Sequence, residues 1–228
     1  MAMKNRYDRN IAALSPEENE RLRGFKACVV GCGGLGGYVI EHLGRLGVLQ
    51  ITAVDGDVFE ENNLNRQLLS DESVLGSSKA EAAVKRMRAV NSEVRVTAVC
   101  EFLTEENSEK ILAEHDIIID ALDNIKTRCI IEKEAQKLKI PLIHGAIAGW
   151  YGQVSVSMPG FPVFDKIYDG AADSGMEKSL GNLPFTAAAV ASIQAAEAVK
   201  VLLGRSGALS GKMLIMDLAS NDYEIFEL

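Results

Sequence analysis

The sequence is poor in the residues that build metal centres and disulfide frameworks. Its 228 residues include four cysteines and three histidines, and no two cysteines form a Cys-x-x-Cys pair. Structural zinc sites are usually assembled from such pairs together with clustered histidines, so we expect no zinc. A chain of this length can bury a core large enough to fold without disulfides. We therefore interpret the four thiols as reduced core residues.

Long apolar stretches are missing as well. The sequence has no run of about 18 apolar residues, the length that a membrane-spanning helix requires. Residues 1–18 are polar and carry no signal-peptide pattern. These two features predict a cytoplasmic protein without a membrane partner.

Basic residues are outnumbered by acidic ones. The chain carries 24 lysines and arginines against 32 aspartates and glutamates, which gives a formal net charge of −8. Proteins that bind nucleic acid present a basic face to the phosphates. The short basic clusters at 21–26 and 85–88 are expected on solvated helix faces. We therefore expect no nucleic-acid partner.

The hydrophobic pattern predicts an α/β fold. Short apolar runs alternate with helical patterns from residue 26 onward, which is typical of a doubly wound, mostly parallel Rossmann-like sheet. We expect strands at 27–30, 49–54, 94–99, 117–119 and 141–143, and helices at 34–46, 78–90, 108–113 and 126–138.

The pattern changes after Gly149. Polar and apolar residues alternate over 153–158, as in a half-exposed antiparallel strand. The next stretch lacks periodicity, as a mobile binding loop does. A helix at 184–203 and antiparallel strands at 212–217 and 223–226 close the chain. We therefore expect one domain, 1–228, with a nucleotide-binding core at 26–150, a mobile loop at 159–182, and a C-terminal helix and strand pair at 183–228.

A glycine-rich turn follows the first predicted strand. Residues 31–36 read Gly-Cys-Gly-Gly-Leu-Gly, which has the Gly-x-Gly-x-x-Gly spacing of nucleotide-binding turns. Glycines at such a turn let backbone N–H groups and a helix N-terminus approach phosphates closely. Asp55 ends the next strand, where an acidic residue takes ribose hydroxyls. A tight turn without a ligand is the alternative. The residues predicted to bind a nucleotide here are Gly31, Gly33, Gly34, Gly36 and Asp55.

Amide and cationic side chains come next in the sequence. Asp57 is followed by an Asn-Asn-Leu-Asn-Arg-Gln run at 62–67. If this run turns helically, Asn63, Arg66 and Gln67 share one face. A guanidinium flanked by amides suits a polyphosphate, so we assign this group and Asp57 to the nucleotide site. A polar capped loop is the alternative.

A lysine is predicted in the first turn of a helix. Ser77 or Ser78 is expected to cap the helix that begins near Lys79. A cation at that end opposes the helix dipole, so an anion at the same end would explain it.

An acidic motif follows the fourth predicted strand. Residues 120–124 read Asp-Ala-Leu-Asp-Asn, at the carboxyl end of the strand, where open parallel sheets bind ligands. A carboxylate there suits Mg²⁺ held against phosphate oxygens. Helix capping by Asp123 or Asn124 is the alternative.

Together these strings resemble the ThiF/MoeB/HesA family, relatives of the adenylation domains of ubiquitin-activating enzymes. The resemblance runs over nearly the whole chain in the family's order, through RYDR, GCGGLG, VDGDVFEENNLNRQ, GSSKAEAA, DALDN, the Thr127-Arg128 pair, GAIAGWYGQV and QAAEAVKVL. Asn10 stands where the family's opening motif has glutamine.

The resemblance implies an ATP-dependent adenylyltransferase. Such an enzyme activates the C-terminal glycine carboxylate of a small ubiquitin-like or sulfur-carrier protein ending in Gly-Gly, and releases pyrophosphate. The site roles that it implies are ribose binding by Asp55, phosphate contacts by Asn63, Arg66, Gln67 and Lys79, Mg²⁺ binding by Asp123, and a contact of Arg9 with the phosphates of the other subunit of a homodimer.

Two departures from the family pattern limit the expected chemistry. Zinc-binding relatives carry two Cys-x-x-Cys pairs that this chain lacks. Some relatives keep a reactive cysteine before the last helix, whereas 166–180 has none. We therefore expect a zinc-free enzyme that stops at the acyl-adenylate, although Cys32 in the glycine turn leaves a later thioester step open.

Other functions stay open at this stage. The glycine turn and Asp55 alone would fit an NAD(P)-dependent oxidoreductase, which gives Arg66, Lys79 and Asp123 no role. An adenylating enzyme acting on a peptide, a small molecule or a modified tRNA base is a second alternative, and a non-catalytic scaffold is a third. The sequence does not name the carrier protein, its pathway or the sulfur donor.

Overall fold

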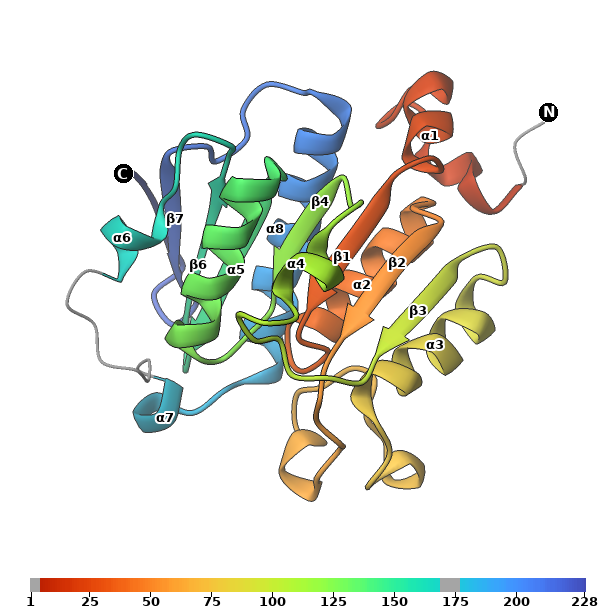
Figure 1. Ribbon diagram of the computed structural model, residues 1–228, viewed down its shortest axis with the longest axis horizontal. Coiled ribbons are helices and arrows are strands. Elements are labelled where there is room, and N and C mark those ends of the chain that lie inside the picture. Colours follow the sequence, from red (N-terminus) through yellow and green to blue (C-terminus); the bar gives the residue numbers. More distant parts are fainter. Residues whose placement is uncertain (1–4, 169–176) are drawn as a thin grey trace.

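A single eight-stranded sheet runs through the molecule (Figure 1). The structure is a computed structural model that describes residues 5–168 and 177–228. The strands follow the order β3-β2-β1-β4-β5-β6-β7-β8 across the sheet. Their bounds are β1 Lys26–Val30, β2 Gln50–Val54, β3 Arg95–Val99, β4 Ile117–Asp120, β5 Leu142–Ala148, β6 Tyr151–Ser157, β7 Lys212–Asp217 and β8 Asp222–Glu227.

The predicted change from parallel to antiparallel pairing is confirmed. Strands β1 to β5 pair in parallel, and β6, β7 and β8 continue the same sheet in antiparallel pairing. Strand β5 runs to Ala148, well past the predicted 141–143, because β6 pairs with it along its whole length. Its second half is rich in glycine and alanine, which have low strand propensity, so local sequence did not indicate the extension.

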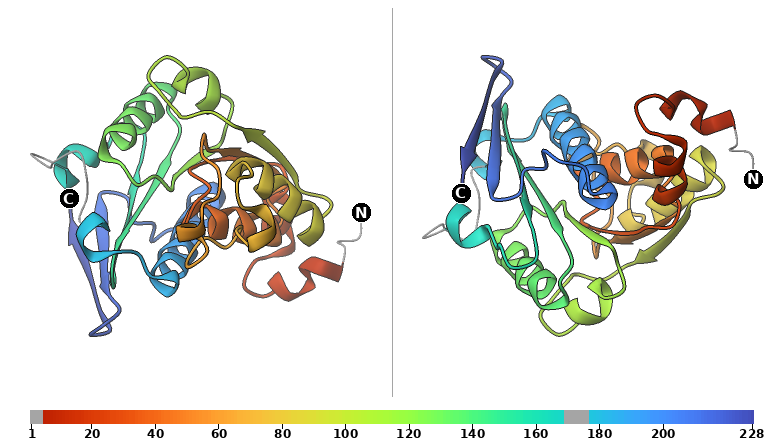
Figure 2. Two further views of the ribbon diagram at one scale, coloured as in Figure 1. Left: turned by 90° about the horizontal axis from the view of Figure 1, so that it is seen from below. Right: turned by 90° about the horizontal axis from the view of Figure 1, so that it is seen from above.

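Helices cover both faces of the sheet (Figure 2). One face packs against α2 (Gly36–Leu46), α3 (Lys79–Val90) and α8 (Pro184–Leu203), and the other against α4 (Ser108–Leu112) and α5 (Ile125–Leu138). Apolar side chains of the strands fill two hydrophobic clusters, one on each side. Burial on both faces explains why the central strands β1 and β4 read as continuous apolar runs in the sequence.

Helix α8 is long and apolar enough to cross a membrane by length and composition alone. In this structure 61% of its most apolar window is buried, and it packs against α2, β5 and β6. A helix that is hydrophobic on most sides is expected in the interior of a protein, which is where α8 lies.

The N-terminal segment lies at the amino ends of the strands, at the top in Figure 1. It consists of the short 3-10 helix η1 (Asn5–Asn10) and α1 (Pro16–Leu22). Tyr7 of η1 is buried, and its hydroxyl accepts a hydrogen bond from Asn91, the C-cap of α3. Helix α1 was not predicted, although its capping box, in which Ser15 and Glu18 bond reciprocally, is a recognisable start signal.

Two sequence expectations need correction. The interval 159–182 was expected to be a mobile loop with little periodic structure, but it contains the short helices α6 (Phe164–Ile167) and α7 (Glu177–Leu180), while 169–176 lies outside the described residues. Cys100 and Cys129 are exposed and not in the core. Cys100 follows the edge strand β3, and Cys129 faces solvent on α5, whose buried face is formed by neighbours such as Ile131. Cys28 and Cys32 are buried as expected.

Two further 3-10 helices, η2 (Glu61–Asn63) and η3 (Glu72–Val74), lie between β2 and α3. This β2–α3 connection extends beyond the carboxyl ends of the strands, at the bottom of Figure 1. It carries most of the amide and cationic residues singled out in the sequence.

Candidate active site

A cleft opens at the carboxyl ends of β1, β2 and β4. Strand β1 has β2 on one side and β4 on the other, so the chain reverses its direction of winding at this point. Such a switch point is where open parallel sheets bind ligands. The predicted residues that line the cleft are Gly31, Gly33, Gly34, Asp55, Asp57, Arg66, Gln67, Lys79 and Asp123.

The glycine turn packs closely against the end of β4. Gly31 has φ +96°, and a Cβ at this position would lie 2.4 Å from the carbonyl oxygen of Ala121. A Cβ on Gly36 would lie 1.8 Å from the carbonyl oxygen of Gly31. Gly36 does not line the cleft, so the structure gives it a packing role, whereas Gly33 and Gly34 present backbone directly to the cleft. Only glycine allows this approach.

Asp55 braces the turn from the end of β2. Its carboxylate accepts hydrogen bonds from the backbone N–H groups of Cys32 (2.7 Å) and Asp57 (2.8 Å). Burial raises the pKa of Asp55, while the two N–H donors and Lys79 oppose that rise. Each carboxylate oxygen can accept more than one hydrogen bond, so this bracing leaves acceptor capacity for a ligand hydroxyl.

Lys79 begins α3, as predicted, and Ser78 is the residue that caps the helix. The Lys79 side chain is largely buried, and its Nζ lies 3.1 Å from the half-exposed carboxylate of Asp57. The anion that the sequence called for at this helix end is therefore present within the chain. The ion pair holds the lysine ammonium at the wall of the cleft.

Arg66 and Gln67 line the cleft side by side in the β2–α3 connection, and Asn63 does not. Arg66 Nη1 donates to the carbonyl oxygen of Asn62 (2.9 Å) and to Oδ1 of Asn65 (2.8 Å). Gln67 is buried, and its Oε1 has no hydrogen-bond partner within the described chain. An orphaned amide oxygen in a ligand cleft is explained if a ligand donor satisfies it.

Asn63 serves the connection itself. Its Oδ1 accepts from the backbone N–H of Glu60 (3.2 Å), and its Nδ2 donates to Oδ1 of Asn62 (2.6 Å). The backbone N–H groups of Arg66 and Gln67 bond to its carbonyl oxygen. Asn63 thus shapes the turn that places Arg66 and Gln67 at the cleft. A phosphate contact by its own side chain stays a prediction.

Asp123 projects into the cleft from the turn between β4 and α5. Its side chain is exposed and makes no hydrogen bond or ion pair with the described residues. Helix α5 is capped instead by Asn124, whose Oδ1 accepts from the backbone N–H of Thr127 (2.8 Å). The capping alternative for Asp123 is therefore not realised, and its carboxylate is available to a ligand.

Several lining residues were not singled out as site residues from the sequence. They are Glu101, Phe102 and Leu103 after β3, Arg128 on α5, and Asn182 before α8. Phe102 is 64% exposed and lies against Gly56, where a Cβ would come within 2.7 Å of its ring. Oδ1 of Asn182 is buried and has no partner in the part of the chain that is described. Of these residues, only Arg128 belonged to a motif noted in the sequence, the Thr127-Arg128 pair of the family resemblance.

Arg9 is not brought to this cleft. It is exposed on η1, which lies at the amino ends of the strands (Figure 1), whereas the residues that line the cleft follow their carboxyl ends. The side chains of Tyr7 and Asn10 fix η1 there, against Gly47 and Leu46 at the C-terminal end of α2. Within a single chain, Arg9 and Asp123 therefore lie beyond opposite ends of the strands.

Comparison with solved structures supports the fold. The structure of E. coli MccB with ATP aligns with a TM-score of 0.84 at 21% identity, covering 98% of this chain and 72% of that one. The structure of PaaA aligns with a TM-score of 0.76 at 24% identity, covering 92% of this chain and 66% of that one. At these identities, the TM-scores establish a shared fold and nothing further.

Comparison of sequences adds the family. The SAMP-activating enzyme E1 of Haloferax volcanii is 35% identical over 228 residues, covering 96% of this chain and 83% of the relative. The sulfur carrier protein adenylyltransferase of Thermus thermophilus is 39% identical over 227 residues, covering 93% and 83%. The adenylyltransferase and sulfurtransferase MOCS3-1 of Zea mays is 32% identical over 98% of this chain, which spans only 49% of that protein. Residues 7–228 match the ThiF family, so the chain belongs to this family and is an adenylyltransferase of its type.

Proposed function

We propose that this protein uses ATP to adenylate the C-terminal glycine carboxylate of a small ubiquitin-like or sulfur-carrier protein, with release of pyrophosphate. The observation that carries the proposal is the composition of one cleft. A glycine turn, two cations and an uncommitted carboxylate, contributed by Gly33, Arg66, Lys79 and Asp123, line it together. The relatives named a SAMP-activating enzyme E1 and a sulfur carrier protein adenylyltransferase support the substrate class.

The chemistry of adenylation fits these residues. A C-terminal carboxylate is ionised at neutral pH, so it can attack the α-phosphorus of ATP without a general base. The site must neutralise charge, align the nucleophile and stabilise the departing pyrophosphate. Arg66 and Lys79 supply fixed positive charge for this purpose, and among the described lining residues there is no histidine or cysteine.

Mg²⁺ fits the cleft as part of the substrate complex. The described residues contain no group of three or more metal-binding side chains. Mg²⁺ is commonly held by one or two carboxylates together with nucleotide phosphates, and Asp123 offers such a carboxylate at the cleft. When bound, Mg²⁺ would neutralise charge on the phosphates. Asp123 would hold it, and Lys79 and Arg66 would orient the same phosphates.

The nucleotide is expected to lie across the glycine turn. Gly33 and Gly34 leave room for phosphates, Asp55 retains acceptor capacity for the ribose, and Phe102 offers an exposed ring beside the end of β2. The orphaned Oε1 of Gln67 provides an acceptor for a ligand donor.

A homodimer completes the proposal. Arg9 lies at the opposite edge of its own sheet, so a phosphate contact by Arg9 requires a second subunit whose η1 approaches this cleft. Its exposure leaves the guanidinium free to enter a neighbouring cleft.

The test is isotope exchange between pyrophosphate and ATP, with Mg²⁺ and a small protein that ends in Gly-Gly. A short neighbouring reading frame with this ending is the first substrate to try, and its tail-truncated form is the control. We expect exchange that requires both Mg²⁺ and the intact tail. Turnover of NAD(P)H without any exchange would support the oxidoreductase alternative, and exchange with a free peptide or small carboxylate alone would replace the proposed substrate.

A further inference from the structure

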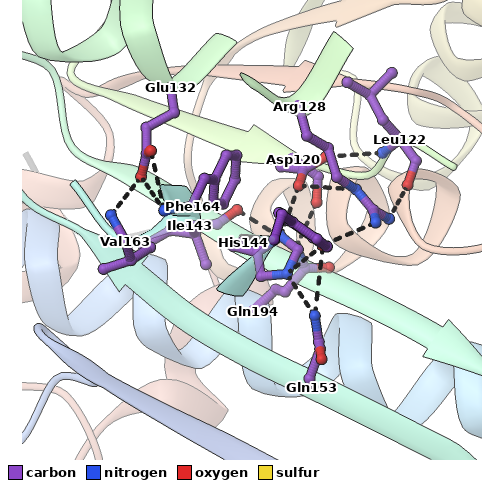
Figure 3. A network of polar contacts seen from close by, with 11 residues as sticks. Asp120, Leu122, Arg128, Glu132, Ile143, His144, Gln153, Val163, Phe164 and Gln194 are labelled. Atoms are coloured by element: carbon purple, nitrogen blue, oxygen red, sulfur yellow. Dashed lines mark hydrogen bonds and ion pairs between the residues drawn. The ribbon is translucent and has the colours of Figure 1, made fainter. Parts of the chain in front are cut away.

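A closed ring of polar side chains lies around Asp120, at the end of β4 (Figure 3). Asp120 ends β4, His144 lies on β5, Arg128 on α5, and Tyr168 directly after α6. His144 Nδ1 lies 2.7 Å from Asp120 Oδ2, and His144 Nε2 lies 3.2 Å from the Tyr168 hydroxyl. Arg128 closes the ring, with Nη1 2.9 Å from that hydroxyl and Nε 3.4 Å from Asp120 Oδ2.

The hydrogen atoms of the ring can be assigned in one consistent direction. An ionised Asp120 only accepts, so Nδ1 of His144 carries a hydrogen and its Nε2 is an acceptor. The Tyr168 O–H donates to that Nε2, and the Tyr168 oxygen accepts from Arg128. The Gln153 amide lies 3.1 Å from the same ring nitrogen and 3.4 Å from the Tyr168 oxygen, to which it donates. Burial lowers the pKa of His144 and raises the pKa of Tyr168 to about 12, so both are neutral in this arrangement.

Two members of the ring form hydrogen bonds with the backbone of Leu122, the residue immediately before Asp123. The N–H of Leu122 donates to Asp120 Oδ1 (3.0 Å), and the carbonyl oxygen of Leu122 accepts from Arg128 Nη2. Both polar backbone groups of Leu122 are therefore held by ring members.

Further contacts fix the ring from below. Asp120 and His144 are fully buried, and Arg128 is 5% exposed. Gln194 of α8 donates to the carbonyl oxygen of Asp120 (2.7 Å), and a Cβ on Gly145 would lie 2.3 Å from the Gln194 side chain. Buried ionic groups are often no more stabilising than well-packed apolar residues of the same volume. Stability alone therefore does not account for four polar side chains at the end of an apolar strand.

We propose that Tyr168 and His144 are positioning residues that, through Arg128 and Asp120, fix the Leu122 backbone and thereby aim the Asp123 carboxylate into the cleft. This proposal rests on the proposed function, because it assumes that Asp123 acts in the cleft. The effect of the ring on the Leu122 backbone does not depend on any reaction. The ring also ties the α6 end of the β6–α8 connection to the same turn.

Tyr168→Phe is the sharpest probe, because it removes one hydroxyl and keeps the ring that packs on His144 and Phe164. The control is Tyr223→Phe, which removes the hydroxyl of a 55% exposed tyrosine on β8. Native-state hydrogen exchange of the Leu122 amide should speed up about tenfold in Tyr168→Phe and stay unchanged in Tyr223→Phe. Unchanged exchange in Tyr168→Phe would overturn the proposal, whether or not the protein adenylates anything.

The effect on Asp123 is measured separately, as the Mg²⁺ requirement of pyrophosphate exchange. Loss of a partner that orients a ligating group typically costs 10–100-fold in metal affinity or activity, so pyrophosphate exchange by Tyr168→Phe should need at least about tenfold more Mg²⁺. The KM for ATP at saturating Mg²⁺ should change little. A second pair of variants, at His144, separates the hydrogen bond to Asp120 from the packing of the side chain. His144→Asn keeps a donor near the position of Nδ1, so its Mg²⁺ requirement in pyrophosphate exchange should approach that of the wild type, whereas that of His144→Leu should not. Equal Mg²⁺ requirements in all four variants would refute the positioning role.

Discussion

The two sides of the turn between β4 and α5 carry the same residue type in opposite environments. On the inner side, Asp120 is fully buried, and its oxygens are bonded to His144, Arg128 and the Leu122 N–H. On the outer side, Asp123 is exposed and makes no polar contact with the described residues. The carboxylate whose oxygens are already bonded within the chain holds the turn, and the one without such partners is available for a ligand. A DALDN motif in the sequence does not separate these roles.

The largest expected effect is on stability, and it should fall on one aspartate only. Asp120→Ala leaves His144 and Arg128 buried without their shared acceptor, so the free energy of unfolding should drop by about 3–5 kcal/mol. Asp123→Ala removes an exposed side chain without partners and should change it by less than about 0.5 kcal/mol. Urea unfolding followed by circular dichroism measures both. Similar losses in the two variants would break the distinction between the two sides of the turn.

The next largest effect is expected at the two cations that line the same cleft as Asp123. Arg66→Ala and Lys79→Ala should each lose roughly 2–4 kcal/mol of transition-state stabilisation, measured as kcat/KM of pyrophosphate exchange. Lys85→Ala is the matched control, because Lys85 is exposed on the same helix as Lys79 and does not line the cleft. A Lys79→Ala variant as active as Lys85→Ala would leave the Lys79–Asp57 pair as a structural contact alone.

A third prediction extends the comparison to the opposite edge of the sheet. Arg9→Ala and Asp123→Ala should each be inactive alone, and mixing them should restore part of the exchange activity. One of the two clefts in a mixed dimer then contains both Arg9 and Asp123. Subunit exchange must be demonstrated separately, for example by native mass spectrometry. An exchanging dimer without any recovered activity would rule out a contact of Arg9 with the cleft of the other subunit.

The smallest effect concerns the cysteines. A variant with all four changed to alanine should keep pyrophosphate exchange and lose about 1 kcal/mol at each of the buried sites, Cys28 and Cys32. Burial raises the pKa of Cys28 to about 12 and that of Cys32 well above its usual value, which disfavours a reactive thiolate at either position. A Cys32→Ala variant that adenylates normally but cannot pass the carrier on would show that the chemistry continues past the acyl-adenylate.

The sequence was most informative where one local pattern decides the structure. Apolar runs located the central parallel strands β1 and β4, because both faces of those strands are buried. The spacing of the glycine turn and the start of α3 at Lys79 were likewise predictable, because each depends on residues adjacent in the chain. Helix α1 could have been found in the same way from its Ser-Pro-Glu-Glu start.

The rest depends on pairs that are distant in sequence. Asp120, His144, Arg128 and Tyr168 come from four different parts of the chain, and no local pattern indicates that three hydrogen bonds and an ion pair join them in one ring. The position of Phe102 against Gly56 follows from the way β3 ends beside β2, which sequence spacing does not encode. Sequence reasoning also could not choose between Asp123 and Asn124 as the helix cap, since both are good capping residues.

We propose that the outer carboxylate, Asp123, serves a metal-dependent adenylation. This role is tested by comparing pyrophosphate exchange by the wild-type protein and by Asp123→Ala across a range of Mg²⁺ concentrations, with a Gly-Gly-ending carrier. We expect Mg²⁺-dependent exchange by the wild type, and its loss at every Mg²⁺ concentration in an Asp123→Ala variant of unchanged unfolding free energy. Near-normal exchange by Asp123→Ala would show that adenylation does not need this carboxylate.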